Sequence, residues 1–242
     1  MSSHRTPATL RKDQRRFAQA EKLLIRAELF YQLVGDGEGL IRVLLTLGIT
    51  YNLQGKLRDA IEVTRTAVRS MSLAANPRLY LCSRYNLAYY YLAIGQVDEC
   101  SELLDEDEEQ YQRFPDPWTQ LRVTWLRGDV AQVRGDERAA EKLYRKAFRG
   151  FLKEGFGYES ALVALDLALL YLRQGRTAEV KRLARQMIPI FQAQDIHREA
   201  LAALALIQKA ARREEVTVEQ LLRLVKYLQE AWGGPGMGLG EL

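Results

Sequence analysis

Glycine recurs at one fixed spacing in this chain, where Gly55, Gly95, Gly135 and Gly175 lie forty residues apart. Each of them ends one apolar-patterned segment and begins the next. A period of about 20–50 residues is typical of a solenoid, in which each repeat buries its apolar face only by stacking on its neighbours. The spacing therefore predicts a repeat array with one continuous, elongated core.

The residues around each corner glycine repeat as well. Small residues recur seven positions before the corner and five positions after it: Gly48, Ala88, Gly128 and Ala168, then Ala60, Cys100, Ala140 and Val180. Small side chains at such sites let the two helices of a hairpin approach closely. Glycine at the corner supplies the left-handed conformation that ends the first helix. The pattern predicts a helical hairpin in every repeat.

The first repeat runs Gly48-Ile-Thr-Tyr51-Asn-Leu-Gln-Gly55-Lys-Leu-Arg-Asp-Ala60. It resembles the tetratricopeptide repeat (TPR) family, whose signature is small–x–x–Tyr–x–x–x–Gly–x–x–x–x–Ala. The resemblance implies an all-α, right-handed superhelical solenoid of antiparallel helix hairpins. The period is forty residues here, against about 34 in the family, which resembles the divergent long-helix arrays of bacterial regulatory and signalling proteins.

A single repeat domain is expected over residues 11–232, between a flexible N-terminus (1–10) and a glycine-rich, flexible tail (233–242). A leading helix is expected over 11–34, before a GDGEG corner at 35–39. The four hairpins are expected at 40–55/56–72, 78–94/96–113, 118–134/136–153 and 158–174/176–194. A fifth unit, 198–232, lacks the corner glycine, so it is expected to cap the array.

Two features depart from a regular array. Asp107 and Met187 stand where the other repeats have Ala67 and Ala147, so the second repeat is expected to pack less tightly. The leading helix has no partner helix before it, as if the chain started inside an array. The apolar face of Phe17–Tyr31 is therefore expected to be open and to bind another chain, with a homo-oligomer as one outcome.

The residue types needed for catalysis or metal binding are scarce. The only histidines are His4 and His197, and the only cysteines are Cys82 and Cys100. No metal site or nucleophilic constellation can be built from so few. The GDGEG segment follows a helix and lacks the lysine-serine ending of a phosphate-binding loop. We therefore expect no enzyme activity, no catalytic residue, no metal and no cofactor.

The sequence pI is about 9.0, but its two basic clusters have the spacing of a solvated helix face. They are Arg11, Lys12, Arg15 and Arg16, and Lys181, Arg182, Arg185, Arg212 and Arg213. No signature of a DNA-reading helix is present, so nucleic acid is not expected as a partner. The sequence has no apolar run long enough to cross a bilayer and no apolar segment after its basic start. A cytoplasmic location without membrane contact is the expectation.

Resemblance to the family also implies which side chains line the concave groove, namely those on one face of each first helix. The predicted peptide-binding residues are Arg42, Asn52, Tyr85, Asn86, Tyr89, Arg122, Trp125, Asp129, Asp166 and Arg173. Asparagine can both donate to and accept from a peptide backbone. Tyrosine and tryptophan are enriched among the residues that carry binding energy. Tyrosines of this segment can equally pack between helices as core.

The sequence predicts a non-catalytic protein–protein interaction scaffold that binds a peptide or helix in the concave groove. Two alternatives remain open. The chain could be the ligand- or peptide-sensing part of a bacterial transcriptional or signalling regulator. It could also be a self-associating structural fragment. The family's lysine, asparagine and arginine set for a C-terminal carboxylate does not recur here, so a ligand of that kind is not expected.

Overall fold

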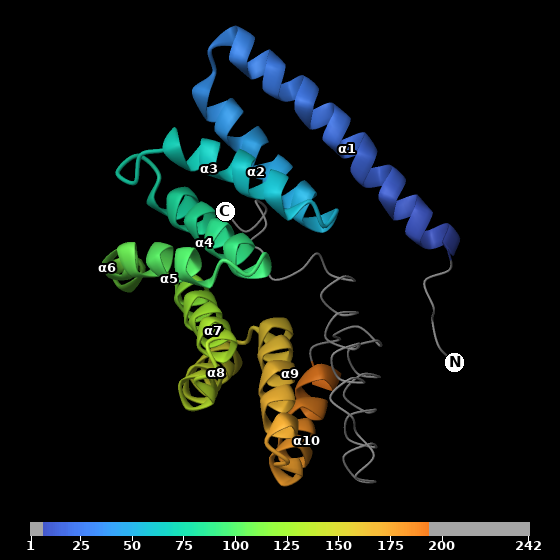
Figure 1. The fold of residues 1–242 in the computed structure, drawn as a ribbon, viewed down its shortest axis with the longest axis vertical. Coiled ribbons are helices and arrows are strands. Elements are labelled where there is room, and N and C mark those ends of the chain that lie inside the picture. Colours follow the sequence, from blue (N-terminus) through green and yellow to red (C-terminus); the bar gives the residue numbers. More distant parts are fainter. Residues whose placement is uncertain (1–6, 194–242) are drawn as a thin grey trace. The chain divides into compact units, whose positions relative to one another are not determined.

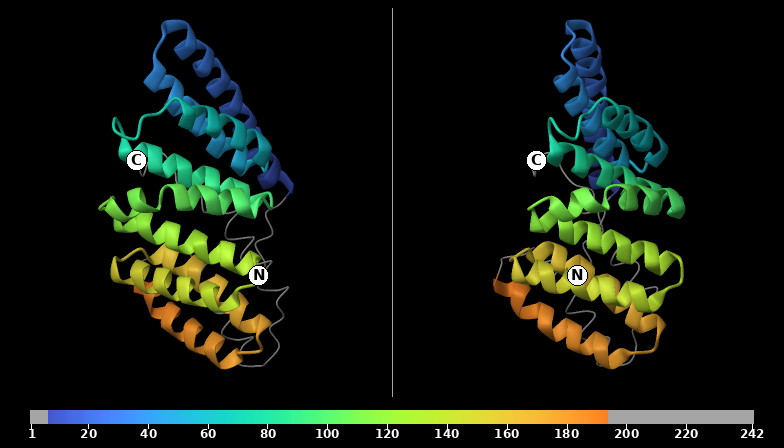
Figure 2. Two further views of the ribbon diagram at one scale, coloured as in Figure 1. Left: turned by 60° about the vertical axis from the view of Figure 1, so that its left-hand side comes forward. Right: turned by 90° about the vertical axis from the view of Figure 1, so that its left-hand side faces the viewer.

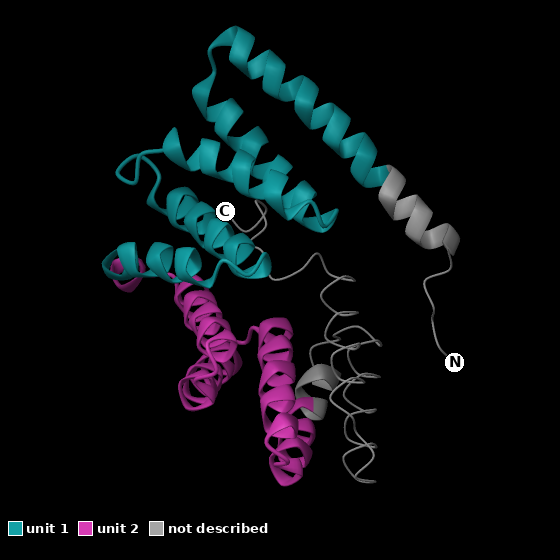
Figure 3. Ribbon diagram, in the orientation of Figure 1, with its two compact units in different colours: residues 1–110, 235–242 teal, residues 111–234 magenta. Residues whose placement is uncertain are grey.

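The computed structural model describes residues 7–193, with side chains described for 16–187. All regular structure in this part of the chain is helical. The described residues divide into two compact units, with the boundary between Gln110 and Tyr111 (Figure 3). The predicted cap (198–232), tail (233–242) and most of the flexible start (1–10) lie outside the described residues. A single domain over 11–232 stays a prediction.

The helices follow the predicted hairpins closely (Figure 1). The first unit holds α1 (Pro7–Val34), α2 (Gly37–Leu53), α3 (Leu57–Arg69), α4 (Pro77–Ala93) and α5 (Val97–Glu106); α6 (Glu108–Arg113) spans the unit boundary. The second unit continues with α7 (Pro117–Val133), α8 (Glu137–Lys153), α9 (Gly157–Arg173) and α10 (Thr177–Ala193). Within each unit, consecutive helices pack side by side (Figure 2). The predicted all-α array of stacked helices is confirmed. None of the described helices combines the length and apolarity needed to cross a membrane.

The corner glycines end their helices as predicted. Gly55, Gly95, Gly135 and Gly175 have φ angles of +74°, +84°, +79° and +70°. The backbone N–H of the residue after each glycine donates to the carbonyl of the residue four positions before that glycine. At Gly55, the Lys56 N–H donates to the Tyr51 carbonyl at 2.8 Å. This bond satisfies a carbonyl that the helix end would otherwise leave open.

Two helices that start a new hairpin, α4 and α7, begin with side-chain caps. Asn76 and Asp116 accept hydrogen bonds from the backbone N–H groups of Leu79 and Thr119, each at 3.0 Å. In both places proline follows the capping residue and occupies the first helical position. Proline suits that position because its missing N–H has no partner there in any case. The Asn-Pro and Asp-Pro pairs therefore start helices as well as ending the loops before them.

Small residues at the helix crossings are packed as the repeat pattern predicts. Ala60, Cys100, Ala140 and Val180 are all fully buried, at 0% exposure. A Cβ atom at Gly48 would lie 2.3 Å from the Thr64 hydroxyl oxygen, and one at Gly128 would lie 2.7 Å from the Tyr144 ring. At these two positions glycine is what lets the first helix of the hairpin approach the second.

The Asp107 position differs from the prediction of one helix over 96–113. The helix breaks there into α5 and α6. Asp107 is 5% exposed, and its carboxylate accepts a hydrogen bond from the Arg84 Nε. Ala67 and Ala147 are 0% exposed at the corresponding positions of unbroken helices. Because Asp107 pairs with Arg84 on α4, a charge takes the place of a packed methyl group.

The N-terminal part of the array also differs in detail. The leading helix α1 begins at Pro7, and only Gly35 and Asp36 form the corner, so residues 37–39 of GDGEG belong to α2. Asp36 caps α2 by accepting from the Gly39 N–H at 2.9 Å. On α1, Glu21 is tied to Lys56 by an ion pair of 2.9 Å. Among the side chains described on α1, from residue 16 on, the large apolar ones that are exposed are Leu23, Ile25, Leu29, Phe30, Leu33 and Val34.

Candidate functional site

Polar and aromatic side chains gather in the second unit on α7, α8 and α9. They form the α7–α9 cluster, which comprises Trp118, Arg122, Trp125, Asp129, Tyr144 and Asp166. The Trp125 indole N–H donates to Asp166 Oδ2 at 2.8 Å, which links α7 to α9. The Tyr144 hydroxyl donates to Asp129 Oδ1 at 2.8 Å, which links α8 to α7. Each carboxylate is thus held by an aromatic side chain of a neighbouring helix.

The Arg122 guanidinium lies beside two indole rings. Its central carbon is 5.1 Å from the ring centroid of Trp118 and 5.5 Å from that of Trp125. Arg122 and Trp125 are each 3% exposed, whereas Trp118 is half-buried. A guanidinium stacked on aromatic faces keeps its charge at low desolvation cost. Its positive charge lowers the pKa of Asp129 and so partly offsets the burial of that carboxyl.

The two carboxyl groups influence each other's ionisation. Burial raises the pKa of Asp166 to about 7, and the hydrogen bond from Trp125 opposes this shift. Burial also raises the pKa of Asp129 well above its ordinary value, and the negative charge of Asp166 raises it further. Like charges that interact in this way disfavour double ionisation. Near neutral pH the pair therefore holds part of a proton.

The sequence predictions located four members of the cluster, namely Arg122, Trp125, Asp129 and Asp166. The predicted Arg173 is exposed near the end of α9. Burial raises the pKa of the Tyr144 hydroxyl, and the positive charge of Arg173 opposes this rise. Sequence reasoning missed Trp118 and Tyr144. Tyr144 comes from α8, a second helix, whereas the family pattern considers first helices only. A signal was present, because the small residue Gly128 is what admits the Tyr144 ring.

The predicted groove residues of the first unit lie on α2 and α4. Tyr85 and Asn86 are buried, at 2% and 6% exposure. Tyr89 is half-buried and meets the ring of Tyr90 edge to face, with the centroids 5.9 Å apart. The remaining two are more open: Asn52 is half-buried, and exposed Arg42 pairs with Glu38 at 3.0 Å. Contact of these five with a partner stays a prediction.

The second unit contains a match to the family model described as tetratricopeptide repeat, at residues 161–186. Among curated protein sequences, none matches this chain.

Solved structures share the fold at low identity. The chain is similar to a Rap protein complexed with competence and sporulation factor, with a TM-score of 0.72 at 14% identity. That match covers 90% of this chain but 61% of the Rap chain, so this chain spans less than two thirds of it. It is also similar to BtubC (BKLC) from P. vanneervenii, with a TM-score of 0.63 at 16% identity over 91% of this chain and 92% of that one.

A kinesin light chain structure with nearly identical TPR-like repeats, from Podosopora anserina, gives a TM-score of 0.57 at 23% identity. It covers 79% of this chain and 95% of that one. These similarities extend over most of the chain and agree with the helix hairpins and glycine corners described above. Residues 161–186 are therefore a tetratricopeptide repeat, and the chain has the fold of tetratricopeptide repeat proteins.

Proposed function

We propose that the chain is a non-catalytic scaffold that binds a peptide segment of a partner protein on the face carrying the α7–α9 cluster. TPR proteins in general mediate protein–protein interactions, which supports the class of function. The observation that carries the proposal is the pair of half-buried carboxylates, Asp129 and Asp166, held by Tyr144 and Trp125. A rigid acidic pair beside indole rings suits a peptide with a cationic side chain or a free amino terminus.

The raised pKa values give this proposal a pH dependence. A bound cation favours the ionised form of both carboxyl groups, so binding releases the proton that the pair holds near neutral pH. Release of a proton becomes easier as the pH rises. Affinity for a cationic peptide is therefore expected to increase between about pH 6 and about pH 8.

Selection of displayed random peptides on the full chain is expected to enrich peptides that contain lysine or arginine. For such a peptide, Asp129→Asn/Asp166→Asn should weaken the Kd by about tenfold or more, because the ion pairs are lost. The amides still accept hydrogen bonds from Tyr144 and Trp125, so the fold should persist. Fluorescence polarisation with the selected peptide measures the affinity of both forms.

The matched control for this experiment is Asp59→Asn, which removes an exposed carboxylate of α3 in the first unit. It should leave the Kd unchanged. Selected peptides without a cationic residue, or equal affinity for the wild type and the double variant, would contradict the proposal.

Similarity to the Rap protein favours one version of this function, in which the chain is the peptide-sensing part of a bacterial regulator. The Rap structure is described as complexed with competence and sporulation factor, which is a statement about that protein. A scaffold binds a segment within a folded partner, whereas a sensor binds a free peptide through its ends. Blocking the amino terminus of the selected peptide separates the two versions, because it abolishes binding only where that terminus is recognised.

We also propose that the array has a forty-residue period and forms a right-handed superhelix. Its concave groove would then also include Arg42, Asn52, Tyr85, Asn86 and Tyr89. The four left-handed glycines support the period.

A second candidate function is self-association through α1. Its support is the exposed apolar face, on which Leu33 is 86% exposed, Leu23 64% and Leu29 61%. Apolar patches of this kind on one helix mark interaction surfaces. Sedimentation velocity over a range of concentrations is expected to show a dimer that Leu29→Glu/Leu33→Glu dissociates. The control Gln32→Glu adds a charge to the same exposed helix and should leave the dimer intact. A monomer at every concentration would contradict this function.

A further inference from the structure

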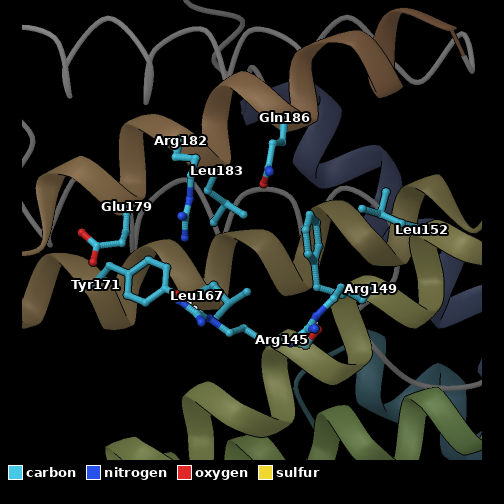
Figure 4. A pocket seen from close by; sticks show the side chains of 10 residues that line it. Arg145, Arg149, Leu152, Leu167, Tyr171, Glu179, Arg182, Leu183 and Gln186 are labelled. Carbon is cyan, nitrogen blue, oxygen red and sulfur yellow. Dashed lines mark hydrogen bonds between the residues drawn. The ribbon is translucent and has the colours of Figure 1, made fainter.

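A hollow of about 580 Å³ lies in the second unit between α8, α9 and α10 (Figure 4). Cavities of about 300–1,000 Å³ are the usual size for bound ligands. Phe148, Leu167 and Leu183 give this α8–α10 pocket an apolar lining, and they are 7%, 1% and 7% exposed. Its lining residues on these helices are distinct from the α7–α9 cluster. The pocket is thus a separate place where an apolar group can be buried.

Arginines surround this apolar lining. Arg145 and Arg149 come from successive turns of α8, and Arg182 reaches toward them from α10 (Figure 4). Residues four apart on a helix are neighbours on its surface. The pocket therefore carries guanidinium groups on two opposing helices. A ligand with carboxylates on both sides of an apolar side chain matches that arrangement.

The charges around the pocket are unequally neutralised. Arg145 pairs with Glu141 at 2.9 Å and donates to the Tyr171 hydroxyl, also at 2.9 Å. Glu179, the acidic residue of the lining, is held by Arg176 at 3.0 Å. In the part of the chain with described side chains, Arg149 and Arg182 form no ion pair with a carboxylate. Two exposed guanidinium groups therefore leave the pocket positive.

Arginine is suited to recognise carboxylates, because its planar guanidinium donates two parallel hydrogen bonds to one carboxyl group. We infer that the α8–α10 pocket is a second binding site, which takes an acidic peptide segment of a partner protein. An apolar side chain of that segment enters between Phe148, Leu167 and Leu183, and carboxylates on either side of it pair with Arg149 and Arg182. The charge preference is opposite to that of the α7–α9 cluster, so the two sites select different segments.

The test uses the full chain and the fluorescein-labelled peptide Asp-Glu-Leu-Phe-Glu-Asp as probe. The peptide is expected to bind, and Arg149→Ala/Arg182→Ala should weaken its Kd at least tenfold, as measured by fluorescence polarisation. Both arginines are exposed, so the variant should keep its helical circular dichroism and its Tm. Charge reversal in Arg182→Glu provides a second variant and should weaken binding further than alanine does.

Arg138→Ala is the matched control, because Arg138 is an exposed arginine of the same helix that does not line the pocket. It should leave the Kd unchanged. Two further peptides test the two halves of the ligand. The uncharged Asn-Gln-Leu-Phe-Gln-Asn and the polar Asp-Glu-Ser-Ser-Glu-Asp should each bind at least tenfold more weakly than the probe.

Three results would overturn the assignment. One is the absence of probe binding, and another is equal weakening by Arg138→Ala and Arg149→Ala/Arg182→Ala, which would show general attraction to a basic surface. The third is displacement of the probe by inorganic phosphate at the concentration of the probe itself, which would reveal a simple anion site. None of these results bears on the cationic-peptide site, because that site is tested with other peptides and other variants.

Discussion

Replacing Arg84 with alanine is expected to lower the free energy of unfolding of the first unit by about 3 kcal/mol at neutral pH. The physical reason is the buried carboxylate of Asp107, which accepts a hydrogen bond from Arg84 and is 5% exposed. Removal of one partner leaves the other charge buried without compensation. Urea unfolding followed by circular dichroism measures the loss.

The double variant Arg84→Ala/Asp107→Ala is expected to recover most of that stability. Alanine is fully buried at the corresponding positions 67 and 147, so a methyl group suits the packing there. Arg69→Ala, which removes an exposed arginine of α3, is the control and should cost little. A double variant as unstable as Arg84→Ala would show that the loss comes from contacts of Arg84 other than Asp107.

The Arg84→Ala variant should also depend on pH. Burial raises the pKa of Asp107, and Arg84 opposes that shift, so its removal raises the pKa further. A carboxyl group whose pKa is higher in the folded state than in the unfolded state stabilises the fold most in acid. The difference between variant and wild type should therefore shrink as the pH falls and Asp107 takes up a proton.

Asp166→Asn is expected to raise the free energy of unfolding by about 2 kcal/mol at pH 8 and to flatten its pH dependence. The carboxyl group has a pKa of about 7 in the folded state and 3.8 as its reference value. Between these values the folded state holds a proton that the unfolded state has lost, so stability falls as the pH rises. Asparagine does not titrate, and its side-chain oxygen still accepts from Trp125.

Urea unfolding at several pH values between about 4 and about 8 checks this prediction. The wild type should lose stability over that window faster than Asp166→Asn. The variant should also lower the pKa of Asp129, because the charge of Asp166 contributes to raising it. Asp59→Asn, in the first unit, should keep the wild-type slope. Parallel curves for wild type and Asp166→Asn would contradict the raised pKa of Asp166.

Local signals in the sequence were sufficient for most of the helix boundaries. These signals are the glycine corners, the Asn-Pro and Asp-Pro helix starts, and the small residues at helix crossings. Each of them acts within one hairpin, so the spacing of residues in the sequence is enough to predict it. The break at Asp107 could not be predicted in the same way. It depends on Arg84, which lies 23 positions earlier in the chain and meets the carboxylate only after α4 and α5 have packed.

The candidate site was predictable only in part, for a related reason. Family positions place Arg122, Trp125, Asp129 and Asp166 on one face of the first helices. They say nothing of Tyr144, which reaches that face from α8 because Gly128 leaves room for its ring. A helical position also fails to fix burial, since Tyr85 and the more open Tyr89 lie one turn apart on α4. The raised pKa values follow from tertiary burial and charge, which no spacing encodes.

The glycine corners have a consequence for handedness. Apart from the glycine and its two chain neighbours, no residue has an atom within 4 Å of where a Cβ would stand at Gly55, Gly95, Gly135 or Gly175, so space does not demand glycine there. Their positive φ angles are what an L-residue resists. A mirror-image D-alanine prefers that half of the conformational map and restricts the unfolded chain more than glycine does. At these four corners the requirement is therefore a residue that accepts a positive φ angle, and not a residue without a side chain.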